Sequence, residues 1–208
     1  MRPILVAAAL TLCTAVATLT GPAVHAAGTG ARASKDPDGS SLPVEDYASY
    51  DPQTTCTKRP RPGTVALGEW LVQTYGGGGG AVNRPCSDPG TSEHKDGRAV
   101  DWTLDADSPA DRALARQFLE DAFATDDEGN QAALARRMGI MYIIWSDHFY
   151  PAYDQFQPES YLSSACRSLK KCSKTLRHRD HMHISLSKAG AKGLTSFYVD
   201  LLRVTTRH

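Results

Sequence analysis

The chain has 208 residues and equal numbers of basic and acidic side chains, 23 of each, so its formal net charge is zero. Proteins that bind nucleic acid usually carry a basic excess, which is missing here. The sequence also has no basic amphipathic helix and no polybasic block of the kind that holds proteins on a membrane surface. These observations argue against nucleic acid and membrane lipid as partners.

The N-terminus predicts a secretory signal peptide over residues 1–26. Arg2 supplies a positive charge, residues 4–20 form an apolar run, and Gly21-Pro22 interrupts that run before a small-residue site that ends at Ala26. A membrane anchor is the alternative, because the run is almost long enough to span a bilayer. The Gly-Pro break and the cleavage site favour removal. We therefore expect an exported protein, secreted or associated with the cell wall, without an integral membrane segment after cleavage.

Cleavage would remove Cys13 and Arg2, which leaves a net charge of about −1 and four cysteines. An even number of cysteines in an exported chain predicts two disulfides. Cys166–Cys172 would close a short local loop, so we favour that bridge together with Cys56–Cys86. A zinc finger is disfavoured, because no C-x-x-C pair is present.

Residues 27–52 are rich in Gly, Ser, Ala, Asp and Pro and contain few apolar residues. Such a segment buries too little apolar surface to offset the entropy lost on ordering. We expect a flexible linker there, followed by one folded domain over residues 53–208.

The first half of this domain predicts two helices and a strand. Residues 65–75 have helical apolar spacing and run into five consecutive glycines, where regular structure is not expected. Residues 99–104 predict a short strand. Ser108-Pro109 then provides an N-cap and a proline at the first helical position for a helix that ends near Phe123.

The second half predicts a helix over residues 131–138, a buried β-branched strand over 140–145, and an alternating strand over 181–186. A C-terminal helix over 194–204 follows. Helices and strands in mixed, non-repeating order indicate an α+β domain.

Two clusters carry chemistry, residues 89–102 (PGTSEHKDGRAVDW) and 178–185 (HRDHMHIS). His94 would precede a turn at Gly97, and Asp101 would lie on the strand that follows. His181 and His183 are two residues apart on a strand, so both point to one face. Imidazole and carboxylate are zinc ligands, and three of them with one water form the usual catalytic zinc site.

Ser92-x-His94-x-x-Gly97-x-Ala99-x-Asp101 resembles the S-x-H-x-x-G-x-A-x-D signature of D-Ala-D-Ala carboxypeptidases. His181-x-His183 is similar to the second motif of their wider group, which includes lysostaphin-type endopeptidases, murein endopeptidases and the hedgehog signalling domain. The resemblance covers about residues 60–190. It implies a small antiparallel sheet flanked by helices and one Zn²⁺ held by His94, Asp101 and His183. It also implies peptidoglycan stem peptides as the substrate.

Departures from the family pattern leave the general base open. D-Ala-D-Ala dipeptidases carry Glu three residues before the last ligand, and this chain has Asp180, as phage L-alanyl-D-glutamate peptidases do. Murein endopeptidases carry histidines five and two residues before that ligand, matched by His178 and His181. The base is therefore Asp180 or His181, with Asp180 narrowly favoured. We assign Arg84, Ser92 and His178 to substrate binding, with Arg84 standing in for an upstream arginine of the relatives.

The sequence thus predicts a secreted zinc metallopeptidase, a D,D-carboxypeptidase or an endopeptidase, that acts on peptidoglycan peptides as a monomer. The alternative is a non-catalytic, zinc-stabilised extracellular binding domain, because the resembling group also contains signalling members. A candidate base beside the ligands favours the enzyme.

Overall fold

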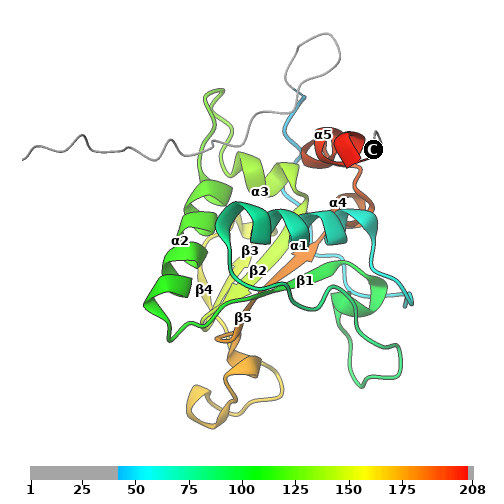
Figure 1. Cartoon of the computed structure of the whole chain (residues 1–208). Helices are drawn as coiled ribbons and strands as arrows, with labels where there is room; N and C mark the ends of the chain where they lie inside the picture. The colour runs from blue at the N-terminus through cyan, green and yellow to red at the C-terminus, as the bar shows by residue number, and fades with distance from the viewer. Residues whose placement is uncertain (1–41, 206–208) are drawn as a thin grey trace, which may run out of the picture.

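Five antiparallel strands form one sheet in the order β1-β5-β2-β3-β4 in the computed structural model, which describes residues 42–205 (Figure 1). The sheet and the helices that pack on it confirm the predicted α+β class. The strands are β1 (Ala99–Thr103), β2 (Ile140–Trp145), β3 (His148–Pro151), β4 (Glu159–Ser160) and β5 (His181–Leu186).

The α-helices are α1 (Pro62–Tyr75), α2 (Pro109–Phe123), α3 (Ala133–Arg137), α4 (Lys188–Lys192) and α5 (Ser196–Thr205). The Ser108 side chain caps α2 by accepting a hydrogen bond from Asp111 N, as its position predicts. Helix α1 starts three residues earlier than the apolar spacing predicts, because Pro62 occupies its first turn. Helix α4 and strands β3 and β4, which are only two to five residues long, have no clear signal in the sequence.

Alternation along β5 gives the sheet two different faces. Met182, Ile184 and Leu186 are buried in the core that the sheet shares with α1, α2, α3 and α5 (Figure 1). The side chains at positions 181, 183 and 185 point to the opposite face. That second face carries a smaller apolar cluster of Met141, Tyr142 and Ile144. The predicted zinc ligands therefore lie on the face away from the main core.

A β-bulge in β2 changes which of its residues reach that second face. Ile140 pairs with Leu186 in β5, and the next pair is Tyr142 with Ser185, so Met141 is the extra residue. The register from Tyr142 to Ile144 is regular, so Tyr142 and Ile144 face the same side as their partners Ser185 and His183, and the bulge instead turns Ile140 into the main core.

The glycine run follows the outer edge of β1. Gly78 forms a bridge with Thr103, and Asp101 N donates to the carbonyl of Ala81 at 2.8 Å. A Cβ atom on Gly80 would lie 1.8 Å from the carbonyl oxygen of Asp101. Glycine at position 80 thus lets this segment approach β1 closely enough to form these bonds.

Residues 42–52, which we expect to belong to the flexible linker, contact the folded domain instead. Arg136 and Arg137 donate to the backbone carbonyls of Glu45 and Leu42, and the Glu45 carboxylate accepts a hydrogen bond from the Ser196 hydroxyl. Tyr47 packs against the main core. Composition alone misses this, because the segment is held by arginines more than 80 residues away in the sequence.

Both predicted disulfides are confirmed. Cys56 pairs with Cys86 and Cys166 with Cys172, with Cα atoms 5.9 and 5.4 Å apart. The predicted signal peptide and linker residues 27–41 lie outside the described residues. Within residues 42–205, no helix is long and apolar enough to cross a bilayer.

Candidate metal centre

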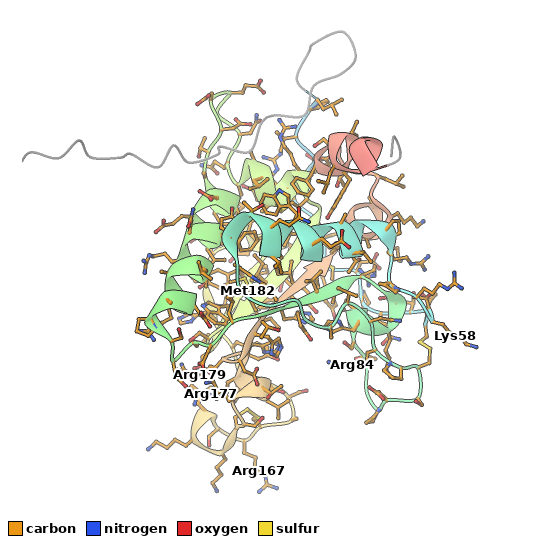
Figure 2. The ribbon with its side chains drawn as sticks, viewed as in Figure 1. Lys58, Arg84, Arg167, Arg177, Arg179 and Met182 are labelled. Atoms are coloured by element: carbon orange, nitrogen blue, oxygen red, sulfur yellow. A yellow bond between two sulfur atoms is a disulfide. The ribbon has the colours of Figure 1, made fainter. Side chains whose placement is uncertain are left out.

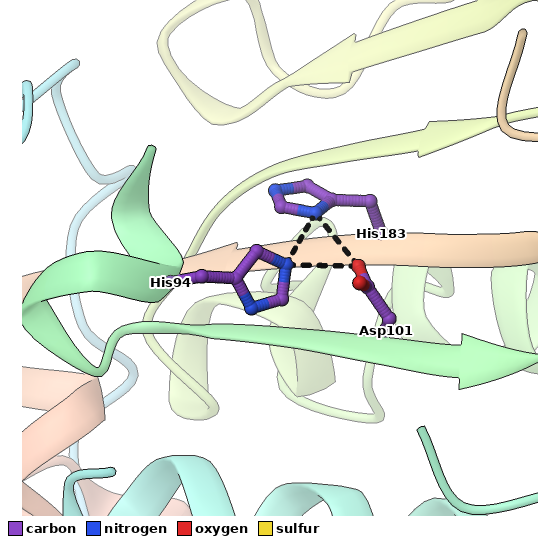
Figure 3. Close-up of side chains that lie close together, drawn as sticks. All are labelled: His94, Asp101 and His183. Atoms are coloured by element: carbon purple, nitrogen blue, oxygen red, sulfur yellow. Dashed lines mark hydrogen bonds and ion pairs between the residues drawn. The ribbon is translucent and has the colours of Figure 1, made fainter. Parts of the chain in front are cut away.

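The structure brings His94, Asp101 and His183 together at one point (Figure 3). His94 Nε2 lies 2.9 Å from Asp101 Oδ1 and 3.2 Å from His183 Nδ1, and His183 Nδ1 lies 3.0 Å from the same carboxylate oxygen. His94 and His183 are buried, and Asp101 is partly buried. Residues up to 89 positions apart in sequence thus direct three donor atoms toward one small space.

His94 is placed by a short 3₁₀ helix, η1 (Glu93–Asp96). The Ser92 hydroxyl caps this turn by accepting a hydrogen bond from His94 N, and Gly97 ends it with a φ of 73°. Ser92, which we assign to substrate binding, therefore has a structural part in presenting His94.

Asp101 and His183 are placed by strand register. They are direct partners in the β1–β5 ladder, so their side chains point to the same face. His183 also pairs with Ile144 of β2, which fixes it between two neighbouring strands.

The three donor atoms fit a metal ion. Ligands of a tetrahedral zinc at about 2 Å lie roughly 3.3 Å apart, close to the observed separations. Two imidazole nitrogens and a carboxylate oxygen at this spacing are ligand atoms that one cation can bind together. These residues can therefore hold a metal ion.

The charges around the three residues also favour a cation. Burial opposes ionisation of Asp101, but hydrogen bonds with His183 and His94 outweigh it and lower its pKa. Burial lowers the pKa of His94, so its imidazole tends to be neutral. A negative carboxylate beside a neutral imidazole is the state that binds metal.

The nitrogen of His183 that faces away from the cluster also has a partner. His183 Nε2 lies 2.9 Å from Ser185 Oγ, and the Tyr142 ring stacks on the imidazole with centroids 5.7 Å apart. Tyr142 donates to Glu93 Oε2 at 2.7 Å. Glu93, Tyr142 and Ser185 are not predicted as site residues from the sequence. The alternation that puts His181 and His183 on one face extends to Ser185, but the pairing of β2 with β5 that puts Tyr142 beside Ser185 has no local sequence signal.

The structure places His181, rather than Asp180, beside the three candidate ligands. His181 Nε2 lies 3.6 Å from Asp101 Oδ1, on the cluster side of the ring. Asp180 is directed away from the cluster: its carboxylate accepts from Thr175 and lies 2.7 Å from His181 Nδ1. Burial raises the pKa of Asp180, but the bonds with Thr175 and His181 outweigh this and lower it.

His178 lies next to His181 and His183, with ring centroids 4.8 and 5.6 Å away. Burial, followed by repulsion from these two histidines, lowers the pKa of His178 to about 3. Its ring is therefore neutral near neutral pH, which suits a hydrogen-bonding group better than a charged anchor.

Arg84 lies on the loop that the Cys56–Cys86 disulfide holds (Figure 2). Its backbone N donates to the carbonyl of His94, and its positive charge contributes to the lowered pKa of His94. Arg84 is exposed, so its positive charge lies near the cluster and remains accessible from solvent.

Two further arginines, Arg177 and Arg179, lie together where the chain enters β5 (Figure 2). Arg177 makes two hydrogen bonds to the Asp147 carboxylate, at 2.8 and 2.7 Å. This bidentate pair ties the segment before β5 to the β2–β3 turn.

A family model described as "VldE, C-terminal domain" matches residues 56–164, which include His94 and Asp101. The comparisons with curated proteins and with solved structures found no match.

Proposed function

We propose that this chain, which belongs to the VldE C-terminal domain family, is a secreted zinc-dependent peptidase that hydrolyses peptide bonds in peptidoglycan stem peptides or cross-links. The observation that carries this proposal is the convergence of His94 Nε2, Asp101 Oδ1 and His183 Nδ1 within 2.9–3.2 Å of one another. Two imidazoles and one carboxylate are a common ligand set of catalytic zinc.

Zinc held by these residues would lower the pKa of a bound water to about 7 and polarise the carbonyl that is attacked. His181 is the group of this chain best placed to take the proton of that water, because its Nε2 points to the cluster. Asp180 holds the other ring nitrogen of His181 and orients the ring. This division of roles replaces the narrow preference for Asp180 as the base.

The substrate class comes from the motif resemblance and is supported by the charge near the site. Stem peptides carry carboxylates, and the exposed guanidinium of Arg84 beside the His94 turn is suited to bind one. Neutral His178 can hydrogen-bond to the peptide beside His181. Two disulfides agree with an oxidising compartment outside the cell, which the predicted signal peptide also favours.

Defined muropeptides test this function. We expect the zinc-loaded mature protein to release a product of lower mass, and mass spectrometry would identify the cleaved bond. A chelator and the His183→Ala variant should both abolish release. A fully zinc-loaded wild type that cleaves neither monomeric nor cross-linked muropeptides, but binds them, would instead indicate the non-catalytic binding domain.

A further inference from the structure

We propose that Glu93, Tyr142 and Ser185 form a one-directional hydrogen-bond chain that keeps the ring proton of His183 on Nε2, so that Nδ1 stays free to bind the metal. The chain makes these three residues positioning residues of the metal site. The inference rests on the metal site of the proposed function and needs neither the substrate nor the reaction.

The contacts run through three secondary-structure elements. Ser185 Oγ lies 2.9 Å from His183 Nε2 on β5. Ser185 is the direct register partner of Tyr142 on β2, so the two side chains lie next to each other on the same face, and we infer that the Ser185 hydroxyl donates to the Tyr142 oxygen. Tyr142 then donates to Glu93 Oε2 at 2.7 Å on η1. The chain thus begins next to His94 and ends at His183, and so connects two of the candidate ligands.

The chemistry of the donors sets the direction of the chain. A carboxylate only accepts, so the single hydroxyl hydrogen of Tyr142 goes to Glu93. The oxygen of Tyr142 is then an acceptor and takes the hydroxyl hydrogen of Ser185. Ser185 Oγ has no hydrogen left to give and accepts one from His183 Nε2.

Asp101 makes this direction matter. Its Oδ1 lies 3.0 Å from His183 Nδ1 and attracts the ring proton to that nitrogen. A proton there would occupy the lone pair that the metal needs. The chain opposes this by offering an acceptor to Nε2 on the other side of the ring.

Burial makes the order costly to reverse. Glu93, Tyr142, His183 and Ser185 are between 0 and 8% exposed. Reversal would leave the Glu93 carboxylate without a donor in a region of low polarity, where an unpaired polar group is expensive. The stacked Tyr142 ring, inclined by 22° to the imidazole, also restricts rotation of His183.

Zinc affinity is the primary test, measured on the folded full-length mature protein by competition with a chromophoric chelator. Glu93→Gln, Tyr142→Phe and Ser185→Ala each leave the side-chain shape nearly unchanged and should weaken zinc binding by about 10–100-fold. Because both substitutions interrupt the same chain, their effects should not add. The double variant Tyr142→Phe/Ser185→Ala should bind zinc about as tightly as the single variant with the lower zinc affinity. Tyr150→Phe is the matched control, since Tyr150 packs on the helix-covered core, and should bind zinc like the wild type.

Two further measurements separate positioning from loss of structure. Near-ultraviolet circular dichroism of the metal-free variants should match the wild type. In ¹H–¹⁵N spectra of the zinc-loaded wild type, the Nε2 proton of His183 should exchange slowly with solvent, and Ser185→Ala should abolish this protection. Wild-type zinc affinity in all three variants, or zinc bound through His183 Nε2, would overturn the proposal. Muropeptide cleavage does not enter these readouts, so the proposed function can fail while this inference stands.

Discussion

Removing the imidazole of His181 should eliminate most of the turnover while leaving the metal in place. His181 Nε2 lies on the cluster side, but His181 is not one of the three converging donors. Loss of a general base typically costs 10²–10⁴-fold in rate. We therefore expect His181→Ala to retain about one zinc per molecule and to lose turnover by roughly that factor.

Asp180 should contribute less, because it acts through His181. Its carboxylate lies 2.7 Å from His181 Nδ1, and a hydrogen bond to a charged group contributes about 1.5–3 kcal/mol. At 1.36 kcal/mol per tenfold change in rate, its loss corresponds to roughly a 10–100-fold decrease. Asp180→Asn, which keeps an acceptor oxygen but removes the charge, should fall at the lower end.

Steady-state turnover on a cleavable muropeptide, with zinc content measured on the same samples, distinguishes the two residues. If Asp180 works by orienting His181, then Asp180→Asn should have no additional effect in a His181→Ala background. Near wild-type turnover in His181→Ala together with an inactive Asp180→Ala would refute the reasoning and restore Asp180 as the base.

Three other predictions concern stability. The hydrogen bonds from Arg177 lower the pKa of Asp147. This pair therefore stabilises the fold above about pH 4 and loses its effect as the pH falls through the folded-state pKa of Asp147. In urea unfolding at pH 7, Asp147→Asn should be less stable than the wild type by about 1.5–3 kcal/mol, and this difference should shrink in acid. Gly80→Ala should lower the thermal midpoint by the equivalent of about 1–3 kcal/mol, because its Cβ would collide with the Asp101 carbonyl; Gly79→Ala, whose Cβ would meet nothing within 4 Å, should leave the midpoint near that of the wild type. Removing the metal with a chelator should lower the midpoint, and zinc should restore it, because a ligand that binds only the native state stabilises that state; an unchanged midpoint would contradict a native metal site.

The resemblance to the D-Ala-D-Ala carboxypeptidase signature implies the three converging residues, and local sequence patterns explain how each of them is presented. His94 and Asp101 are separated by a turn that needs Gly97, and His183 lies on a strand with period-two alternation. Both patterns are local, so they can be read from neighbouring residues. The disulfides are equally accessible, because four cysteines allow few pairings.

Features that depend on distant contacts are not readable in this way. The bulge at Met141 turns Ile140 into the main core, and no residue type near it signals a bulge. The order of residues 42–52 depends on Arg136 and Arg137, which a composition argument does not include. The roles of Asp180 and His181 depend on the side-chain direction of Asp180, which family motifs alone leave ambiguous.

The register pair Asp101–His183 also has a consequence for how the protein folds. These residues are 82 positions apart, yet they face each other across neighbouring strands. Closing so long a loop is slow, and the β1–β5 pairing must be correct to the residue before the three donors can meet. An unfolded or misregistered chain can offer the metal only single histidines and carboxylates. The ion would therefore bind tightly only after this long-range pairing has formed, and the rate at which newly refolded protein captures zinc should report the formation of the β1–β5 pair.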